Sequence, residues 1–460
     1  MLVSPVDRSR LPAPGPDPAF RFPVAERHAL ANGLRVWTVE HREVPVLAVL
    51  ILLTAGSAED PDDRPGLAAL TADMLDEGSG GRSALDLEAA FARLGAQFDT
   101  EIGSDGTLLS ALSLSRRRDE VLELLADVVR RPRLAEPDFL RVRDLRLNRL
   151  LQLRDVAAAV ADRTLTALLY EGHPYGHLPI GSSPSLRACT LEEVRRHHAR
   201  AWKPWRVTLI MTGDASHEEM LASAERVFGD WRPASDEDDG FAPREVNGNA
   251  ARPSPLVALV HRPAAAQSEI RVGQVAAPRQ TPDYYPLVLL NAVLGGQFVS
   301  RLNMNLREDK GYTYGVRSGF DFRRGPGPFL VQAAVQTPAT ADAIQETLAE
   351  IAALGGSRPP TPEEMELARL SVTRGYPRNF ETAGQVARGL LQLALYGLPA
   401  DTFEQFVPCI ERVGVDEVIA AAGRLDPRRM VVTVVGDREQ VLPGLASLGL
   451  GEPRILDAAD

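Results

Sequence analysis

Strand-like and helical patterns of hydrophobic and polar residues follow one another in the same order twice along the chain. A strand alternates apolar and polar residues with a period of two, and a helix repeats apolar residues three or four positions apart. The first copy predicts strands and helices at 34–40, 44–54, 66–77, 84–94, 97–102, 107–114, 119–129, 137–170, 191–202 and 206–212. The second copy repeats the order at 256–261, 269–276, 284–294, a helix ending at 307, 312–321, 328–336, 341–354, 362–395, 415–425 and 430–435.

The spacing between the two copies is nearly constant. Tyr170 corresponds to Tyr396 and Gly213 to Gly436, a separation of roughly 225 residues in both cases. Such a repeat predicts two α+β modules of one fold, because each copy contains a complete set of strands and helices. We expect the chain to divide into an extended lead-in at 1–25, a first module at 26–232, a linker at 233–255 and a second module at 256–450.

Composition and charge exclude several classes of function. The chain has 460 residues, 44% of them hydrophobic, and a net charge of −11, which disfavours nucleic acid and anionic membranes as partners. Its longest apolar run, 44–53, is shorter than the roughly 20 residues that a membrane helix needs. No secretory signal is visible in 1–21, and two cysteines make no disulfide framework. We therefore expect a cytoplasmic protein, and a periplasmic location stays open.

Candidate chemistry lies in the run 306–316, Leu-Arg-Glu-Asp-Lys-Gly-Tyr-Thr-Tyr-Gly-Val. Gly311 is a typical helix stop, and the following residues read as a strand on which Tyr312, Tyr314 and Val316 would share one face. Arg307 at the helix end and Tyr314 on the strand offer hydrogen-bond donors that suit a peptide carbonyl or an oxyanion. A solvated charge run and a half-buried strand aromatic explain the same residues, so the pattern alone leaves both interpretations open.

The motifs and their order resemble those of the pitrilysin/insulinase family of metallopeptidases, the zinc enzymes with an inverted motif. The similarity is greatest to its short-chain branch, which includes bacterial peptidases and the mitochondrial processing peptidase. The residues that carry the resemblance are Leu294-Gly295-Gly296, Ser300-Arg301-Leu302, Leu306-Arg307-Glu308, Gly311-Tyr312-Thr313-Tyr314, Gly66-Leu67-Ala68, Met74-Leu75, Gly78-Ser79 and His173-Pro174-Tyr175-Gly176. The resemblance covers roughly residues 23–449 and implies two α/β-sandwich modules in tandem, each a mixed, mainly antiparallel sheet covered by helices.

One departure from the family pattern concerns the metal. Family enzymes carry H-x-x-E-H on a helix, where two histidines bind zinc and the glutamate activates water. The three corresponding positions are Ala69, Ala72 and Asp73 here, and no carboxylate stands near 148–149, where the distal ligand is expected. His173 and His177 are four residues apart, but Pro174 and Gly176 between them disfavour a helix, and the adjacent His197 and His198 would point to different helical faces. We expect no catalytic zinc in this chain.

The resemblance implies a role for this chain beside a second one. In the family, a closing half-molecule contributes an arginine and a tyrosine to the zinc site of another half, and Arg307 and Tyr314 occupy those positions. The chain would then be the metal-free subunit of a heterodimeric zinc endopeptidase that encloses peptides or unfolded proteins in a chamber. Zinc would be held by an H-x-x-E-H partner. Gly295 and Gly296 would let substrate backbone approach closely, or they simply end a helix.

Two other interpretations stay open. The chain could be a scaffold or peptide-binding subunit without a catalytic part, or an independent enzyme that uses Asp73 and other ligands. A homodimer is also compatible with the isolated chain, since a surface that faces a related partner can pair with itself. The sequence identifies neither the substrate and its cleavage preference nor the partner, and it does not decide whether Arg307 and Tyr314 are active or vestigial.

Overall fold

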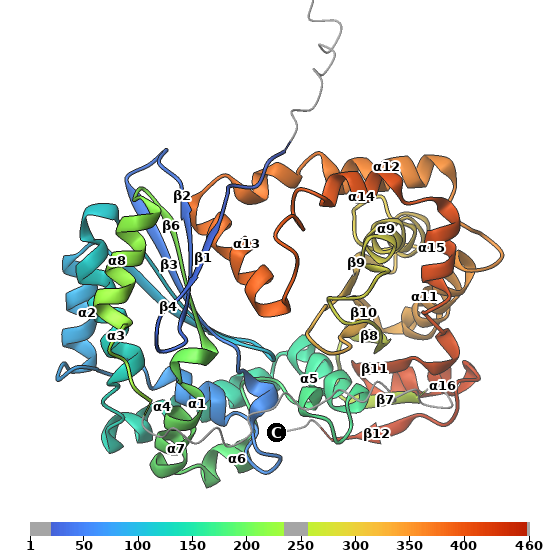
Figure 1. Cartoon of the computed structure of the whole chain (residues 1–460). Helices are drawn as coiled ribbons and strands as arrows, with labels where there is room; N and C mark the ends of the chain where they lie inside the picture. The colour runs from blue at the N-terminus through green and yellow to red at the C-terminus, as the bar shows by residue number, and fades with distance from the viewer. Residues whose placement is uncertain (1–19, 234–255, 458–460) are drawn as a thin grey trace, which may run out of the picture.

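Two six-stranded sheets, each covered by helices, make up the computed structural model of the chain (Figure 1). The structure describes residues 20–233 and 256–457. The prediction of an α+β fold with two mixed, mainly antiparallel sheets is confirmed. Most of the predicted lead-in at 1–25 and nearly all of the predicted linker at 233–255 lie outside the described residues, and the proposed module boundaries stay predictions.

The first sheet has the strand order β1-β2-β6-β3-β5-β4, in which β2 and β6 are parallel and all other neighbours are antiparallel. Its central strand β3 reads VLAVLILL and is buried along almost its whole length, as a strand covered on both faces should be. The strands are β1 (Glu26–Ala29), β2 (Arg35–Glu40), β3 (Val46–Leu53), β4 (Gln97–Ile102), β5 (Thr107–Leu114) and β6 (Val207–Gly213).

The second sheet repeats this arrangement. Its order is β12-β7-β11-β8-β10-β9, so β7, β11, β8, β10 and β9 take the places of β2, β6, β3, β5 and β4. The strands are β7 (Leu256–His261), β8 (Gln267–Val275), β9 (Thr313–Phe320), β10 (Pro328–Gln336), β11 (Val431–Gly436) and β12 (Arg454–Leu456). The outermost strands differ, because β1 runs antiparallel to β2 whereas β12 runs parallel to β7.

Helices cover both sheets, and two long predicted helices are each divided. The predicted helix 137–170 breaks between Arg154 and Ala157, and 362–395 breaks before Thr382, which caps a new helix. Among the described residues, none of the helices is both long and apolar enough to cross a membrane. In the first copy the helices are α1 (Leu67–Asp73), α2 (Ala84–Arg93), α3 (Arg118–Arg130), α4 (Glu136–Arg154), α5 (Ala157–Leu169), α6 (Ser183–Ala188), α7 (Leu191–Ala201) and α8 (His217–Phe228). In the second copy they are α9 (Tyr284–Leu294), α10 (Arg301–Asn303), α11 (Thr340–Leu354), α12 (Pro362–Thr373), α13 (Ala383–Tyr396), α14 (Phe406–Arg412), α15 (Val415–Ala422) and α16 (Arg438–Ser447).

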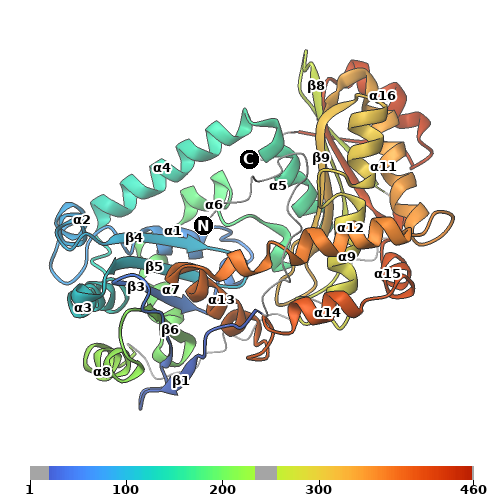
Figure 2. The same ribbon diagram turned by 90° about the horizontal axis from the view of Figure 1, so that it is seen from above.

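Each copy of the repeat sends one helix to the other copy's sheet. Figure 2 shows the long helix α4 running beside the first sheet towards α5, which lies against β8 and β11 of the second sheet. In return α13, drawn in orange in Figure 1, packs on β3 and β6 of the first sheet. Leu390 of α13 shares a buried cluster with Leu50 and Ile210, and Ala161 of α5 shares one with Val435. The exchange buries apolar surface of both copies together, so the two sheets are held as one unit.

Candidate functional site

A cleft of about 1000 Å³ opens beside β9, the edge strand of the second sheet. Four residues that the sequence singled out, Gly295, Gly296, Arg307 and Tyr314, all line this cleft. Strands β8 and β10 supply more of its wall, and α5 of the first copy contributes Asp162. The fold therefore brings together the residues expected at a substrate site, from segments separated along the chain.

Arg307 is carried by a π-helical turn, Met304–Asp309, that continues from α10. The guanidinium carbon of Arg307 lies 3.9 Å from the centre of the Phe298 ring, and its Nη1 lies 3.5 Å from a carboxylate oxygen of Glu308. The ring face attracts the cation and limits its movement. Gly311, with a φ of +64°, ends this helical segment as predicted, because it takes a left-handed conformation that favours glycine.

Tyr314 points away from the body of the protein, contrary to the prediction that it shares a strand face with Val316. Val316 is 1% exposed and Tyr314 is 94% exposed. The cause is a bulge in β9: Thr313 pairs with Val335 and Val316 with Ala333, so Tyr314 and Gly315 stand opposite a single residue of β10. Within the described part of the chain, no hydrogen bond involves the Tyr314 hydroxyl. The phenol is therefore available to a molecule outside the chain.

Gly295 and Gly296 have packing reasons to be glycine. A Cβ on Gly295 would lie 2.5 Å from the Ser318 hydroxyl, and one on Gly296 would lie 2.6 Å from the Asn291 amide. Gly295 also accepts a backbone hydrogen bond from Ser318 at 3.1 Å, which joins the end of α9 to β9. These contacts account for both residues as the end of a helix packed on a strand, and a role in binding substrate stays a prediction.

An ion cluster centred on a buried arginine forms the wall of the cleft that faces α5. Arg271 of β8 is 4% exposed, and its Nε lies 2.5 Å from Asp162 of α5. The same guanidinium donates to Glu269 at 2.9 Å and to the carbonyls of Ile270 and Ala158 at 3.0 and 3.3 Å. One cation therefore serves two carboxylates and holds the exchanged helix against the second sheet.

The positions of the zinc motif cannot supply a metal site. Ala69 and Ala72 are 0% and 2% exposed and carry no donor atom. Asp73 forms an ion pair at 2.5 Å with Arg146 of α4, and Arg146 also donates to the carbonyl of Pro179 at 2.7 Å. In residues 20–233 and 256–457 there is no group of three or more side chains suited to hold a metal ion. Two of the three positions carry no donor atom and the remaining carboxylate is bound by a guanidinium, so these residues do not fit zinc.

A cavity of about 460 Å³ lies between α4 and β4. Asp73, Asp76, Arg146 and Arg149 line it together with residues of β4. Reduced contact with water, followed by repulsion from Glu77 and Asp73, raises the pKa of the Asp76 carboxyl to about 6. The sequence placed the missing distal ligand near 148–149, and Arg149 does line this cavity, but the residue that reaches Asp73 lies one helical turn earlier at Arg146.

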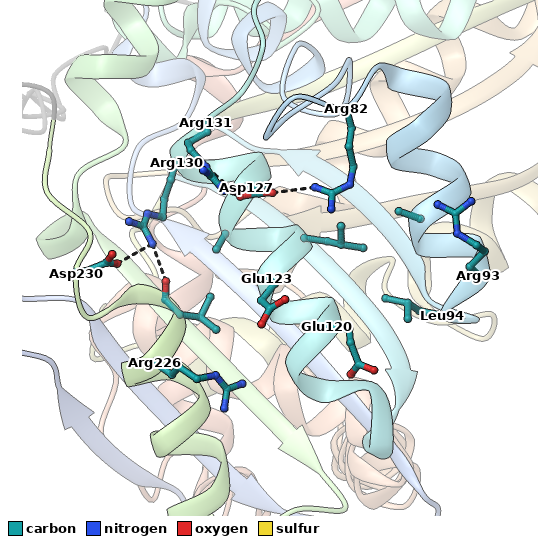
Figure 3. Close-up of a pocket in the computed structure, with 14 residues that line it drawn as sticks. Arg82, Arg93, Leu94, Glu120, Glu123, Asp127, Arg130, Arg131, Arg226 and Asp230 are labelled. Carbon is teal, nitrogen blue, oxygen red and sulfur yellow. Dashed lines mark hydrogen bonds and ion pairs between the residues drawn. The ribbon is translucent and has the colours of Figure 1, made fainter.

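A separate cavity of about 540 Å³ lies among α2, α3 and α8 and is rich in arginine. Figure 3 shows Arg82 and Arg131 on Asp127, and Arg130 on Asp230. Arg226, which also lines it, pairs with Asp119 at 2.8 Å. Because these cations are neutralised by neighbouring carboxylates, the cavity has little capacity to bind an anion.

Comparison with known proteins identifies relatives of both halves of the chain. A family model described as insulinase (peptidase family M16) matches residues 35–178, and one described as the peptidase M16 inactive domain matches residues 188–372. A protein named as a zinc protease from Mycobacterium bovis is 29% identical over 91% of this chain and 94% of its own length. A probable mitochondrial-processing peptidase subunit beta from Schizosaccharomyces pombe is 24% identical over 60% of this chain and 59% of its own.

A solved structure gives the same picture of the fold. The crystal structure of a peptidase M16 inactive domain from Pseudomonas fluorescens matches 90% of this chain and 98% of its own chain, with a TM-score of 0.83 and 27% identity. A protease from Helicobacter pylori matches 90% of this chain and 99% of its own with a TM-score of 0.78 and 18% identity, which shows a shared fold.

Proposed function

The chain belongs to the M16 peptidase family, the insulinase or pitrilysin family, and we propose that within it this chain is the metal-free subunit of a two-subunit zinc endopeptidase. In this role it supplies Arg307 and Tyr314 to a peptide or unfolded protein held at the zinc of a homologous H-x-x-E-H partner. The partner's zinc would activate water and polarise the scissile carbonyl.

The observation that carries the proposal is the contrast between two sets of residues in one chain. At the motif positions, donor atoms are missing or neutralised by Arg146. In the cleft, the Tyr314 phenol is exposed on a strand that is held by hydrogen bonds, and Arg307 is stacked on Phe298. A chain that lacks metal ligands at the motif positions but keeps an exposed phenol and a guanidinium in one cleft fits a subunit that completes another chain's site.

The two side chains can stabilise the intermediate of peptide hydrolysis in different ways. A phenol hydroxyl donates one directed hydrogen bond, which suits the oxyanion that forms when water adds to the peptide carbonyl. A guanidinium stays charged at every physiological pH and can hold a backbone carbonyl or balance the negative charge. Neither group has to gain or lose a proton during the reaction.

The names of relatives support both parts of the proposal. The mycobacterial relative is named as a zinc protease, and the yeast and rat relatives are named as beta subunits of the mitochondrial processing peptidase. A beta subunit implies a second subunit, so heterodimers occur in this family. Zinc chemistry in a partner and a supporting role for this chain are consistent with both names.

The decisive experiment replaces the phenol hydroxyl. We expect Tyr314→Phe, assembled with the zinc-binding partner, to lower kcat about a hundredfold, because one preorganised oxyanion donor is lost. Peptide turnover is measured by fluorescence and assembly by size-exclusion chromatography. Tyr312→Phe is the matched control: it removes the same hydroxyl two residues away, from a side chain that packs against the core of the second module, and should leave turnover unchanged.

Three outcomes would contradict the proposal. Unchanged turnover in Tyr314→Phe would remove the phenol from the mechanism. If the wild-type chain forms a complex with the partner but adds nothing to its proteolysis, the chain is a scaffold. Stoichiometric zinc in the isolated chain, measured by mass spectrometry and accompanied by peptidase activity without a partner, would make it an independent enzyme.

A further inference from the structure

Arg307 and Tyr314 lie on two separate segments, the π-helical turn and the bulged strand β9, and Asn303 joins these segments. Its Nδ2 donates to the carbonyl of Val316 at 2.9 Å, and its Oδ1 accepts from the amide N–H of Val316 at 3.1 Å. Val316 is the first residue after the bulge that carries Tyr314. The side-chain amide therefore bonds to Val316 in the way that a neighbouring strand would.

The surroundings of Asn303 hold its amide in one orientation. Asn303 is 6% exposed. Its Nδ2 also lies 3.2 Å from the carbonyl of Gln297 and 3.2 Å from the Ser300 hydroxyl. Next to it, the Ser318 N–H donates to the Gly295 carbonyl at 3.1 Å. The outer edge of β9 is thus already bonded at Val316 and Ser318, and it is fixed rather than open to an added strand there.

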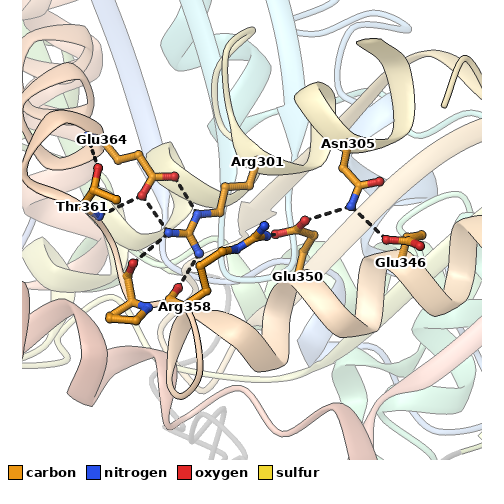
Figure 4. Close-up of polar contacts among 8 residues, drawn as sticks. Arg301, Asn305, Glu346, Glu350, Arg358, Thr361 and Glu364 are labelled. Atoms are coloured by element: carbon orange, nitrogen blue, oxygen red, sulfur yellow. Dashed lines mark hydrogen bonds and ion pairs between the residues drawn. The ribbon is translucent and has the colours of Figure 1, made fainter. Parts of the chain in front are cut away.

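The opposite side of the same helical segment is fixed by charges, as Figure 4 shows. Arg301 pairs with Glu364 of α12 at 2.7 Å and donates to the Arg358 carbonyl at 2.6 Å. Asn305 donates to Glu346 and Glu350 of α11 at 2.9 and 2.8 Å. The segment is therefore attached firmly to α11 and α12, and Asn303 transmits this fixed position across to β9.

We propose that Asn303 is a positioning residue that holds the Tyr314 phenol in its catalytic place relative to Arg307. The inference rests on the proposed function, because it assigns Asn303 a part in the same site. Only an amide of this length both donates to the carbonyl and accepts from the N–H of Val316. Without the Asn303 amide, the bulge in β9 loses its hydrogen bonds to the helical segment, and the exposed Tyr314 phenol becomes free to move away from the oxyanion.

The test is a double-mutant cycle in the assembled heterodimer. We expect Asn303→Ala to lower kcat about tenfold with KM changed less than about twofold, because the donor is misplaced while substrate contacts remain. In the Tyr314→Phe background, the same replacement should lower kcat by less than about twofold, since no donor is left to misplace. Asn303→Asp, which keeps the acceptor and loses the donor, serves if Asn303→Ala fails to fold and should give the same pattern.

Asn32 provides a matched control in the first module. Its amide likewise joins two segments, donating to the Phe228 carbonyl at 2.7 Å and accepting from Leu34 N–H at 3.1 Å, but it lies outside the cleft. Asn32→Ala should lower the melting temperature without changing kcat. The proposal is overturned if Asn303→Ala reduces kcat equally with and without the Tyr314 hydroxyl, or leaves kcat unchanged while Tyr314→Phe reduces it. If Tyr314→Phe itself has no effect, the proposed function and this inference both fail.

Discussion

The two modules share the order and relative directions of five of their six strands, but they differ in whether the chain itself binds their polar side chains. In the first, Asp73 is bound to Arg146 at 2.5 Å, beside two alanines that are fully buried. In the second, Tyr314 is 94% exposed while the backbone next to it is hydrogen-bonded on both edges. A polar group neutralised by its own chain contributes to stability. One that is exposed on a fixed backbone is available to another molecule, so the second module is where chemistry should be sought.

In each module a buried arginine also joins two elements. Arg271 joins the second sheet to α5, and Arg146 joins α4 to α1. If the comparison holds, replacing either arginine should lower stability, whereas the rate of the reaction should depend on Arg307, Tyr314 and the positioning residue Asn303. Stability is measured for each variant below, and turnover in the assembled enzyme for Arg146→Ala and Tyr314→Phe.

The largest effect on stability is expected for Arg271→Ala. It leaves Asp162 and Glu269 without their shared cation and detaches α5 from β8, so we expect the free energy of unfolding to fall by about 4 kcal/mol. Calorimetry of the isolated chain measures the change. Arg317→Ala is the matched control, because Arg317 lines the same cleft but is exposed, and its loss should change stability by less than about 0.5 kcal/mol. Equal effects of the two variants would show that the cluster does not hold the helix.

Much of this architecture could be predicted from the sequence. A continuous apolar run such as 46–53 and an alternating run such as 97–102 are both typical of strands, and the repeat indicated the same order of elements in both halves. Arg307, Tyr314 and the two glycines were found because their motif stands in the right order, and the structure places them around one cleft. Short elements with weaker patterns, β1, β12, α6 and α14 among them, were not predicted.

Three features depend on tertiary contacts that a linear pattern does not contain. The exchange of α5 and α13 is hidden, because an amphipathic helix does not reveal which sheet it covers. The bulge that turns Tyr314 outward arises from a mismatch in pairing with β10, so strict alternation put it on the wrong face. The contact of Arg146 with Asp73 depends on the relative placement of α4 and α1, which the sequence does not show.

A fall in pH should have an intermediate effect on stability through a buried histidine of the first module. His197 lies on α7, which packs against α1, and burial lowers its pKa from 6.5 to about 4. Above pH 6.5 the imidazole is neutral in both states; as the pH falls from 6.5 to 4 the unfolded chain gains a proton that the folded chain does not. His197 by itself should therefore lower stability by about 3 kcal/mol over this window and contribute no change above it.

Tryptophan fluorescence can follow this loss selectively, because all four tryptophans, Trp37, Trp202, Trp205 and Trp231, lie in the first half of the chain. His197→Gln should lose less stability than wild type between pH 7 and pH 4 in urea titrations. His41→Gln, which removes a histidine outside the hydrophobic core, is the control. Identical pH curves for wild type and His197→Gln would show that this histidine does not couple protonation to folding.

The smallest effect on stability, and the sharpest test of the comparison, is expected for Arg146→Ala. Because Arg146 pairs with a single carboxylate, and Asp73 keeps 41% of its side chain in solvent, we expect the free energy of unfolding to fall by about 2 kcal/mol, less than for Arg271, which serves two carboxylates and joins α5 to β8. Arg149→Ala is the control, since Arg149 lines the same cavity but is exposed and bonds only weakly to Gln152. In the assembled enzyme, Arg146→Ala should leave kcat unchanged, whereas Tyr314→Phe should lower kcat and leave the melting temperature unchanged. A loss of turnover in Arg146→Ala with assembly intact would mean that the first module acts on substrate, and the division of roles between the modules would have to be abandoned.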